Sequence, residues 1–266
     1  MKHIATAIFA ILLAASGHDG GPIKFLGTPV DGPEKEFAAQ LKSKGFTYVP
    51  SDGTYVGEFN GTAVRIRTGA YRGRIHSVGV FFPACDAESA KLRYNALLFD
   101  LIRNPELENT CTEGFIPDNA DMAYGDTDHT ETFCYFDHAR DSADIDSDLI
   151  ARTGFFLHQS GLLSNEQKEE FVRLASGSRP EQHSPYAAFW EAINKGDATP
   201  KIRESFSECG EDRRLFQKKI QPLFYSALIQ AMISAADGRI EVNLHRILSQ
   251  YFVSIIFRNT HNLPNL

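Results

Sequence analysis

The sequence predicts an α+β protein in which antiparallel sheets carry helices on one face. Two observations lead to this class. Short runs of alternating apolar and polar residues, separated by turns that contain Gly and Asn, follow one another between residues 46 and 82, which is typical of an antiparallel meander. Segments with apolar residues at helical spacing flank that region. We expect these parts to form one unit, and the rest of the chain to form a second.

The chain begins with a segment typical of a secretory signal, residues 1–17. Lys2 and His3 form a basic end, residues 4–15 are apolar, and Ala15-Ser16-Gly17 offers a cleavage site. The apolar stretch is too short to span a bilayer. We therefore expect export, with cleavage near Gly17 and a periplasmic or secreted mature chain. The alternative is a buried N-terminal helix.

The first predicted unit covers residues 18–108. Asp31-Gly32-Pro33 opens a helix that Gly45 ends. An amphipathic helix closes the unit over about residues 86–103. Asn60-Gly61 lies between two alternating runs and predicts a type I′ hairpin turn. Four strands are expected between the helices, over residues 46–50, 55–59, 63–68 and 74–82.

The second predicted unit covers residues 109–266 and ends with a helix and a hairpin, as the first unit does. This similarity suggests two related α+β units in tandem. Pro222 predicts a kink or a restart in the last helix. The expected elements are a strand over 132–136, helices over 165–175, 186–194 and 212–236, and closing strands over 240–244 and 251–257.

Composition and charge exclude several classes of protein. Among 266 residues, 42% are hydrophobic, only 4 are Cys and 20 are Gly, which excludes a disulfide scaffold, a collagen and a disordered chain. The net charge of −7 argues against a nucleic-acid binder, because phosphate contacts need a basic face. The apolar run over 223–236 is interrupted by Ser226 and Gln230 and predicts a core helix, so no transmembrane segment is expected in the mature chain.

No motif for catalysis is found in the sequence. It contains no Gly-x-Ser-x-Gly elbow, no Ser-x-x-Lys pair, no His-Glu-x-x-His and no Gly-rich phosphate loop. We therefore lean towards a protein that is not an enzyme and that needs no cofactor.

Residues 113–148 form an acidic segment with eleven carboxylates and one basic residue, Arg140. Oxygen-rich clusters of this kind can hold calcium. The alternative function is therefore a divalent-cation-dependent protein or hydrolase with its site in this segment. Asp144, Asp146 and Asp148 do not match the EF-hand pattern, so a solvated acidic loop is the simpler interpretation. The candidate metal ligands are Asp126, Asp128, His129, Asp137 and His138.

The even number of cysteines permits disulfides in an exported protein. Cys111 and Cys134 flank part of the acidic segment and are the pair we expect if there is a bridge. The alternative is four separate thiols, which include Cys85 and Cys209.

The third and fourth strands concentrate basic side chains. Val64 and Ile66 alternate with Arg65 and Arg67, so both arginines should lie on the open face of the sheet if the apolar pair faces the helices. The orientation of Arg74 and His76 stays open, because they share their parity with Val78 and Val80. We expect Arg65, Arg67, Arg74 and His76 to bind an acidic envelope protein or a glycan. The alternative is internal pairing with the acidic segment.

Several segments resemble a group of secreted proteins from gut anaerobes. The resemblance is weakest over residues 152–219, and the chain departs from the group at Arg258, where the group usually has Asp. The resemblance implies that the protein is exported and supports the predicted domain limits, but it implies no activity. The segments that carry it are Phe25-Leu26-Gly27-Thr28-Pro29-Val30-Asp31-Gly32, Glu36-Phe37, Leu41, Lys44-Gly45-Phe46, Gly57-Glu58-Phe59-Asn60-Gly61, Asn104-Pro105, residues 116–124, 133–136 and 251–257, and Asn259, Asn262 and Asn265.

The expected tandem of helix-plus-meander units also resembles the arrangement in β-lactamase inhibitor protein, which is a protein-binding scaffold. The sequence therefore predicts an exported, non-enzymatic interaction module of the bacterial envelope, with an open sheet face as its binding surface.

Overall fold

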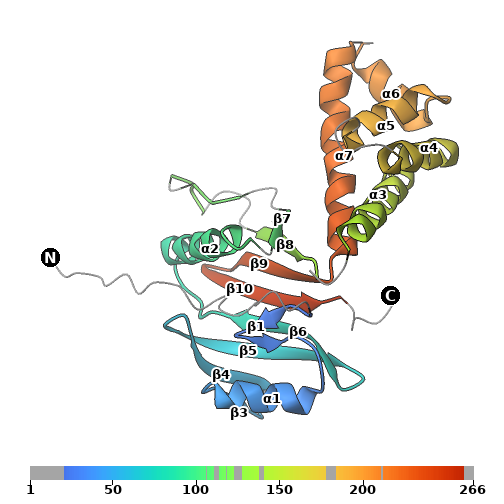
Figure 1. Cartoon of the computed structure of the whole chain (residues 1–266). Helices are drawn as coiled ribbons and strands as arrows, with labels where there is room; N and C mark the ends of the chain where they lie inside the picture. The colour runs from blue at the N-terminus through green and yellow to red at the C-terminus, as the bar shows by residue number, and fades with distance from the viewer. Residues whose placement is uncertain are drawn as a thin grey trace. The chain divides into compact units, whose positions relative to one another are not determined.

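The structure is a computed structural model that describes residues 21–105, 107–110, 114–117, 119–122, 128–137, 141–177, 184–210 and 212–260. The chain forms two compact units (Figure 1). Unit 1 comprises residues 1–139 and 236–266, and unit 2 comprises residues 140–235. The described residues hold seven helices, a large antiparallel sheet and a small one, so the predicted α+β class is confirmed.

Unit 1 is built on an eight-stranded sheet in which all neighbouring strands are antiparallel. A two-stranded hairpin, β1 (Lys24–Phe25) and β2 (Thr28–Pro29), precedes it. In spatial order the strands of the large sheet are β3 (Thr47–Val49), β4 (Thr54–Phe59), β5 (Thr62–Tyr71), β6 (Arg74–Phe81), β10 (Gln250–Asn259), β9 (Gly238–Ile247), β8 (His129–Tyr135) and β7 (Leu107–Asn109).

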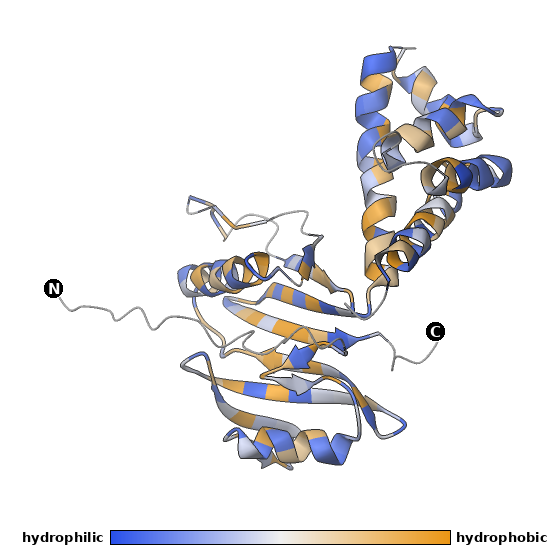
Figure 2. Ribbon diagram, viewed as in Figure 1, coloured by the Kyte–Doolittle hydropathy of each residue, from blue (hydrophilic) through white to orange (hydrophobic). Residues whose placement is uncertain are grey.

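One face of this sheet is covered and forms the core of unit 1. The register places Ile66, Val80, Ile255 and Val242 in one row across four strands, and all four are fully buried. Helix α1 (Glu34–Ser43) and helix α2 (Ala87–Ile102) pack their apolar residues into the same cluster. Figure 2 shows apolar and polar residues alternating along the strands.

The structure divides the chain at other positions than the sequence predicts. The expected boundary lies between residues 108 and 109, with the closing hairpin in a second unit. Instead, β10 pairs with β6 and β9 pairs with β8, so the closing strands complete the sheet that the first four strands begin. Alternation along a segment identifies a strand, but it carries no information about the partner with which the strand pairs.

Unit 2 is entirely helical within its described residues and has its own core, which includes Leu157, Phe171, Phe189 and Phe224. Side chains of Asp141, Ser164, Ser184 and Thr199 cap the first four of its helices. The helices are α3 (Ser142–Gln159), α4 (Asn165–Ser176), α5 (Pro185–Asn194), α6 (Pro200–Glu208) and α7 (Arg213–Ala235).

Two of these helices, α3 and α6, are not among the predicted elements, and α7 is continuous through Pro222. None of the described helices is both long and apolar enough to cross a membrane.

Candidate functional site

The uncovered face of the eight-stranded sheet is the candidate site. Arg65 and Arg67 are both exposed on the side of β5 opposite the buried Val64 and Ile66, as the alternation predicts. Within the described part of unit 1, the helices pack on the other face. We call this surface the open face and define it by Arg65, Arg67, His76, Phe81, Arg239, Glu241, Ile256 and Arg258.

A β-bulge fixes the orientation of His76, which the sequence leaves open. The pairing shifts between Gly69 and Ala70, so that Gly69 opposes Ser77 and Ala70 opposes Ile75. His76 is thus an extra residue on β6, and bulges of this kind change the side to which the following residues point. Ile75 and Val78 are both buried in the core, which leaves His76 and Ser77 between them on the open face.

Arg74 is separate from the other predicted binding residues. Its Nη2 donates to Oδ1 of Asp31 at 2.8 Å, and it pairs with Tyr71 at the end of the β5–β6 hairpin. Tyr71 is six residues from Arg65, which corresponds to about 20 Å along a strand. The structure therefore brings Arg65, Arg67 and His76 to one surface and places Arg74 at the end of the sheet.

Arginines outnumber carboxylates on the open face. Strands β5, β6, β9 and β10 contribute four arginines and one carboxylate, that of Glu241, which lies between Arg239 and Arg258, and the flanking strands β4 and β7 add Glu58 and Glu108. Nε of Arg239 lies 2.9 Å from one carboxylate oxygen of Glu241 in an ion pair, and Nε of Arg258 donates a hydrogen bond to the other oxygen at 3.0 Å. This triad keeps one net positive charge. Arg65 is paired with Asp52 at the edge, whereas Arg67 forms no ion pair with any described residue.

Two rings on this face lie close to glycines. A Cβ atom at Gly79 would come within 3.0 Å of the Phe81 ring, and one at Gly69 would come within 3.0 Å of the His76 ring. Burial, and next the positive charge of Arg258, lower the pKa of His76 below its usual value. His76 is therefore neutral at neutral pH, and the arginines supply the charge of the open face.

The predicted internal pairing of the arginines with the acidic segment is not seen among the described residues. Asp128 binds Nδ1 of His245 at 3.2 Å, and Asp148 pairs with Arg152 at 2.9 Å within α3. Glu131 is buried and accepts a hydrogen bond from the backbone N–H of Gly114. The three predicted binding arginines form no described ion pair with residues 113–148.

The candidate metal ligands do not meet at one place. Asp128 and His129 lie at the start of β8, whereas Asp137 follows its end, about 20 Å further along the strand. Asp137 instead accepts from the backbone N–H of Gly21 at 2.9 Å. Asp126 and His138 lie outside the described residues, and the described His, Cys, Asp and Glu side chains form no group suited to a metal ion.

The Asp141-to-Asp148 series has a structural role in the helix that the sequence does not predict. The Asp141 side chain caps α3 by accepting from the N–H of Ala143 at 2.9 Å, and Asp144 lies in the first turn. Carboxylates at a helix N-terminus are stabilised by the helix dipole.

Cys85, Cys134 and Cys209 form no disulfide with one another. Burial raises the pKa of the Cys134 thiol to about 11, so as a thiol it would be protonated at neutral pH. Cys111 lies outside the described residues, and its predicted bridge to Cys134 stays a prediction.

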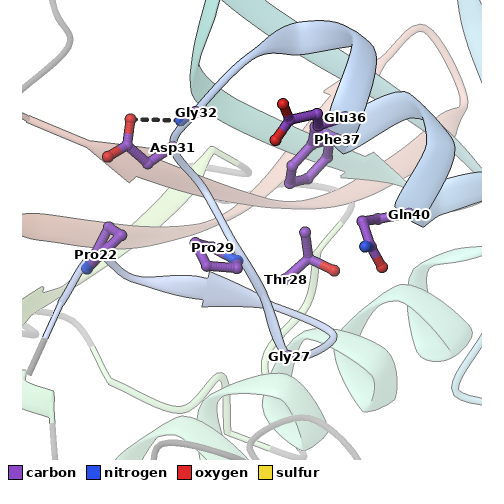
Figure 3. Close-up of a pocket in the computed structure, with 9 residues that line it drawn as sticks. All are labelled: Pro22, Gly27, Thr28, Pro29, Asp31, Gly32, Glu36, Phe37 and Gln40. Atoms are coloured by element: carbon purple, nitrogen blue, oxygen red, sulfur yellow. Dashed lines mark hydrogen bonds between the residues drawn. The ribbon is translucent and has the colours of Figure 1, made fainter. Parts of the chain in front are cut away.

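A pocket lies between the β1–β2 hairpin and α1 (Figure 3). This pocket encloses about 480 Å³ and is lined by the carboxylates of Asp31 and Glu36 and by Thr28 and Gln40, together with Pro and Phe side chains. Asp31 accepts from the N–H of Gly32 at 2.5 Å and also binds Arg74. Seven of its nine lining residues fall within residues 25–37, the stretch that carries the first part of the family resemblance.

Comparisons with known proteins add no further assignment. A scan against protein-family models, a search of curated proteins and a search of solved structures find no match to this chain.

Proposed function

We propose that this chain is an exported, non-enzymatic binding module of the bacterial envelope, and that the open face binds an acidic partner. The observation that carries the proposal is the uncovered sheet face with its excess of arginines over carboxylates. An antiparallel sheet that packs helices on one side can present its other side to a ligand. Export is supported by the signal-like residues 1–17.

Binding fits these side chains better than catalysis does. Arginine stays protonated throughout the physiological pH range, so it can hold an anion but cannot exchange a proton with it. Its planar guanidinium matches carboxylate and sulfate groups, to which it can donate two hydrogen bonds. Arg67 is the clearest candidate for such a contact, because no described acid neutralises it.

Charge reversal tests this proposal. The double variant Arg65→Glu/Arg67→Glu should bind poly-L-glutamate and dextran sulfate at least about tenfold more weakly than the native protein does, a loss of ~1.4 kcal/mol. Native binding should also weaken steeply between low salt and about 0.5 M salt, because exposed charges are screened. Binding would be measured by fluorescence anisotropy with labelled protein.

The matched control reverses two exposed arginines of α7, Arg213→Glu/Arg214→Glu, which changes the net charge by the same amount. The control should bind within about twofold of the native protein, and both variants should keep the native melting temperature, since exposed substitutions change stability little. Equal losses in both variants would show a non-specific effect of net charge, and no loss in either would overturn the proposal.

A further inference from the structure

We propose that the acidic partner is a glycan, and that the open face binds an acidic sugar whose ring stacks on Phe81 while an arginine of β5 binds its carboxylate. This inference rests on the proposed binding function of the open face and names the ligand class.

The Phe81 ring forms a platform on the open face. It is 40% exposed, and it lies against the backbone of Gly79, which has no side chain to lift it away from the sheet. A glycine beneath an aromatic ring on a sheet surface is a known stabilising arrangement. Both Gly79 and Phe81 lie in the regular part of β6, and the Cε2–Cζ edge of the ring contacts the Gly79 position, so the ring is supported at that edge while 40% of the side chain stays exposed to solvent.

Two arginines flank this platform on the next strand. Arg65 is directly opposite Phe81, and Arg67 is directly opposite Gly79. Residues directly opposite each other in an antiparallel pair have Cα atoms about 5 Å apart and point to the same side. Both guanidinium groups can therefore reach a ligand that rests on the ring. Arg67, which no described acid neutralises, is the better partner for its carboxylate.

An acidic sugar matches both parts of this surface. The C–H groups on one side of a pyranose ring pack well against an aromatic face, which is apolar and carries partial negative charge. The carboxylate of a uronic acid projects from the edge of the sugar ring, where a guanidinium can bind it with two hydrogen bonds. An acidic peptide would use the arginines but would leave the Phe81 platform without a matching group.

A nucleic acid fits less well. A single strand could stack a base on Phe81, but the net charge of −7 gives a general repulsion of densely charged polyanions. An oligosaccharide with weaker charge density reduces this cost.

The experiment separates stacking of the sugar ring on Phe81 from binding of its carboxylate by an arginine. Tetragalacturonate has rings and carboxylates, its methyl ester has rings without charge, poly-L-glutamate has carboxylates without rings, and a single-stranded oligonucleotide has bases and phosphates. Each would be titrated by calorimetry into the native protein and into Phe81→Leu and Arg67→Gln. Phe81→Leu keeps an apolar side chain of similar reach, and Phe155→Leu on α3, where Phe155 is 54% exposed, is its matched control.

We expect tetragalacturonate to bind the native protein at least about tenfold more tightly than its methyl ester does. Phe81→Leu should weaken the binding of tetragalacturonate severalfold and leave the binding of poly-L-glutamate unchanged. Arg67→Gln should weaken the binding of both ligands, and Phe155→Leu should weaken the binding of neither. If poly-L-glutamate binds through Arg67 and tetragalacturonate does not bind, the glycan inference fails and the proposed function stands. Tighter binding of the oligonucleotide also overturns the glycan inference. If none of the four binds the open face, both proposals fail.

Discussion

At the scale of single residues, His76 shows how the open face affects stability. Its ring is partly buried over Gly69, and within the described residues its Nδ1 atom is buried without a hydrogen-bond partner. Protonation would place a second positive charge near Arg258 in this partly desolvated position. Desolvation first, and Arg258 second, therefore lower the pKa of His76 in the folded protein.

This lowered pKa predicts a specific loss of stability in mild acid. Between the lowered pKa of the folded state and the usual value of 6.5, the unfolded chain binds more protons than the folded protein does. The free energy of unfolding therefore decreases as the pH falls below about 6.5. His76→Gln should remove this part of the pH dependence. Urea denaturation of both proteins between pH 5 and pH 8 measures the difference.

The carboxylates with lowered pKa values act in a different pH range, and Asp100, whose pKa burial raises, is the same in both proteins and does not affect their difference. Hydrogen bonds hold the pKa values of Asp52, Asp86 and Glu170 below their usual values, that of Glu170 at about 2. Their contribution is present at neutral pH and is lost only as the pH falls below about 4.5. If His76→Gln keeps the native slope between pH 5 and pH 6.5, the role assigned to His76 is wrong.

The residues of the site differ in how far the sequence can predict them. Alternation with Val64 and Ile66 is sufficient to place Arg65 and Arg67, because β5 is regular over these residues. The same alternation predicts that Phe81 lies on the open face, because it follows the buried Val80 on β6. Arg239, Glu241 and Arg258 join the site only through the pairing of β6 with β10, whose residues are far apart in the chain. No local pattern encodes that pairing.

At the scale of elements, the hairpin turns of unit 1 use one geometry with different residues. Asn60-Gly61 joins β4 to β5 with φ values of 50° and 70°, as its sequence predicts. Leu26-Gly27 and Arg72-Gly73 also have positive φ at both residues, although neither Leu nor Arg signals such a turn. The glycine is the common feature, since it adopts positive φ without strain.

The turn between β9 and β10 departs from this pattern. Leu248 has a φ of 58° and is followed by Ser249 instead of Gly. A Leu in the left-handed region costs about 1–2 kcal/mol, whereas Asn adopts it more readily. Leu248→Asn should therefore raise the free energy of unfolding by about 0.5–1 kcal/mol. The gain is not offset by lost packing, because the Leu248 side chain is 89% exposed.

Equilibrium urea denaturation measures this change, and Ser249→Asn is the control. Ser249 does not have a positive φ, so the same side chain placed there relieves no strain and should leave stability nearly unchanged. A native-like or lower midpoint for Leu248→Asn would show that the Leu248 conformation is not strained, or that an interaction of this side chain compensates for the strain.

At the scale of the whole molecule, unit 2 is an insertion into a β-hairpin. Strands β8 and β9 are antiparallel neighbours, and Tyr135 pairs with Gly238 at the end where a short turn would normally join them. The backbone N–H of Asp137 donates to Oδ2 of Asp237 at 2.9 Å, so the two ends of the insertion meet. Local patterns predict both strands, but the long helical segment between them conceals that they are neighbours.

The two cores suggest that each unit folds on its own. The apolar cluster of unit 1 contains no residue from 140–235, and that of unit 2 contains only such residues. Helices α3 and α7, which begin and end unit 2, pack against each other and thereby hold its two ends together. A folded insertion of this kind spares the hairpin most of the entropy that closing a long flexible loop would cost.

Removal of unit 2 should therefore leave unit 1 folded. If residues 138–236 are replaced by Gly-Asn-Gly-Ser, Asp137 and Asp237 can still form their hydrogen bond across a short hairpin loop. The shortened protein should unfold cooperatively in urea, give the circular dichroism spectrum of a sheet protein, and bind poly-L-glutamate within about twofold of the full chain, because the open face lies entirely in unit 1. Residues 141–235, expressed alone, should be helical and monomeric. A shortened chain that binds 1-anilinonaphthalene-8-sulfonate and unfolds without cooperativity would instead mean that the sheet depends on the helical unit, since exposed apolar surface without fixed packing is the mark of an incomplete core.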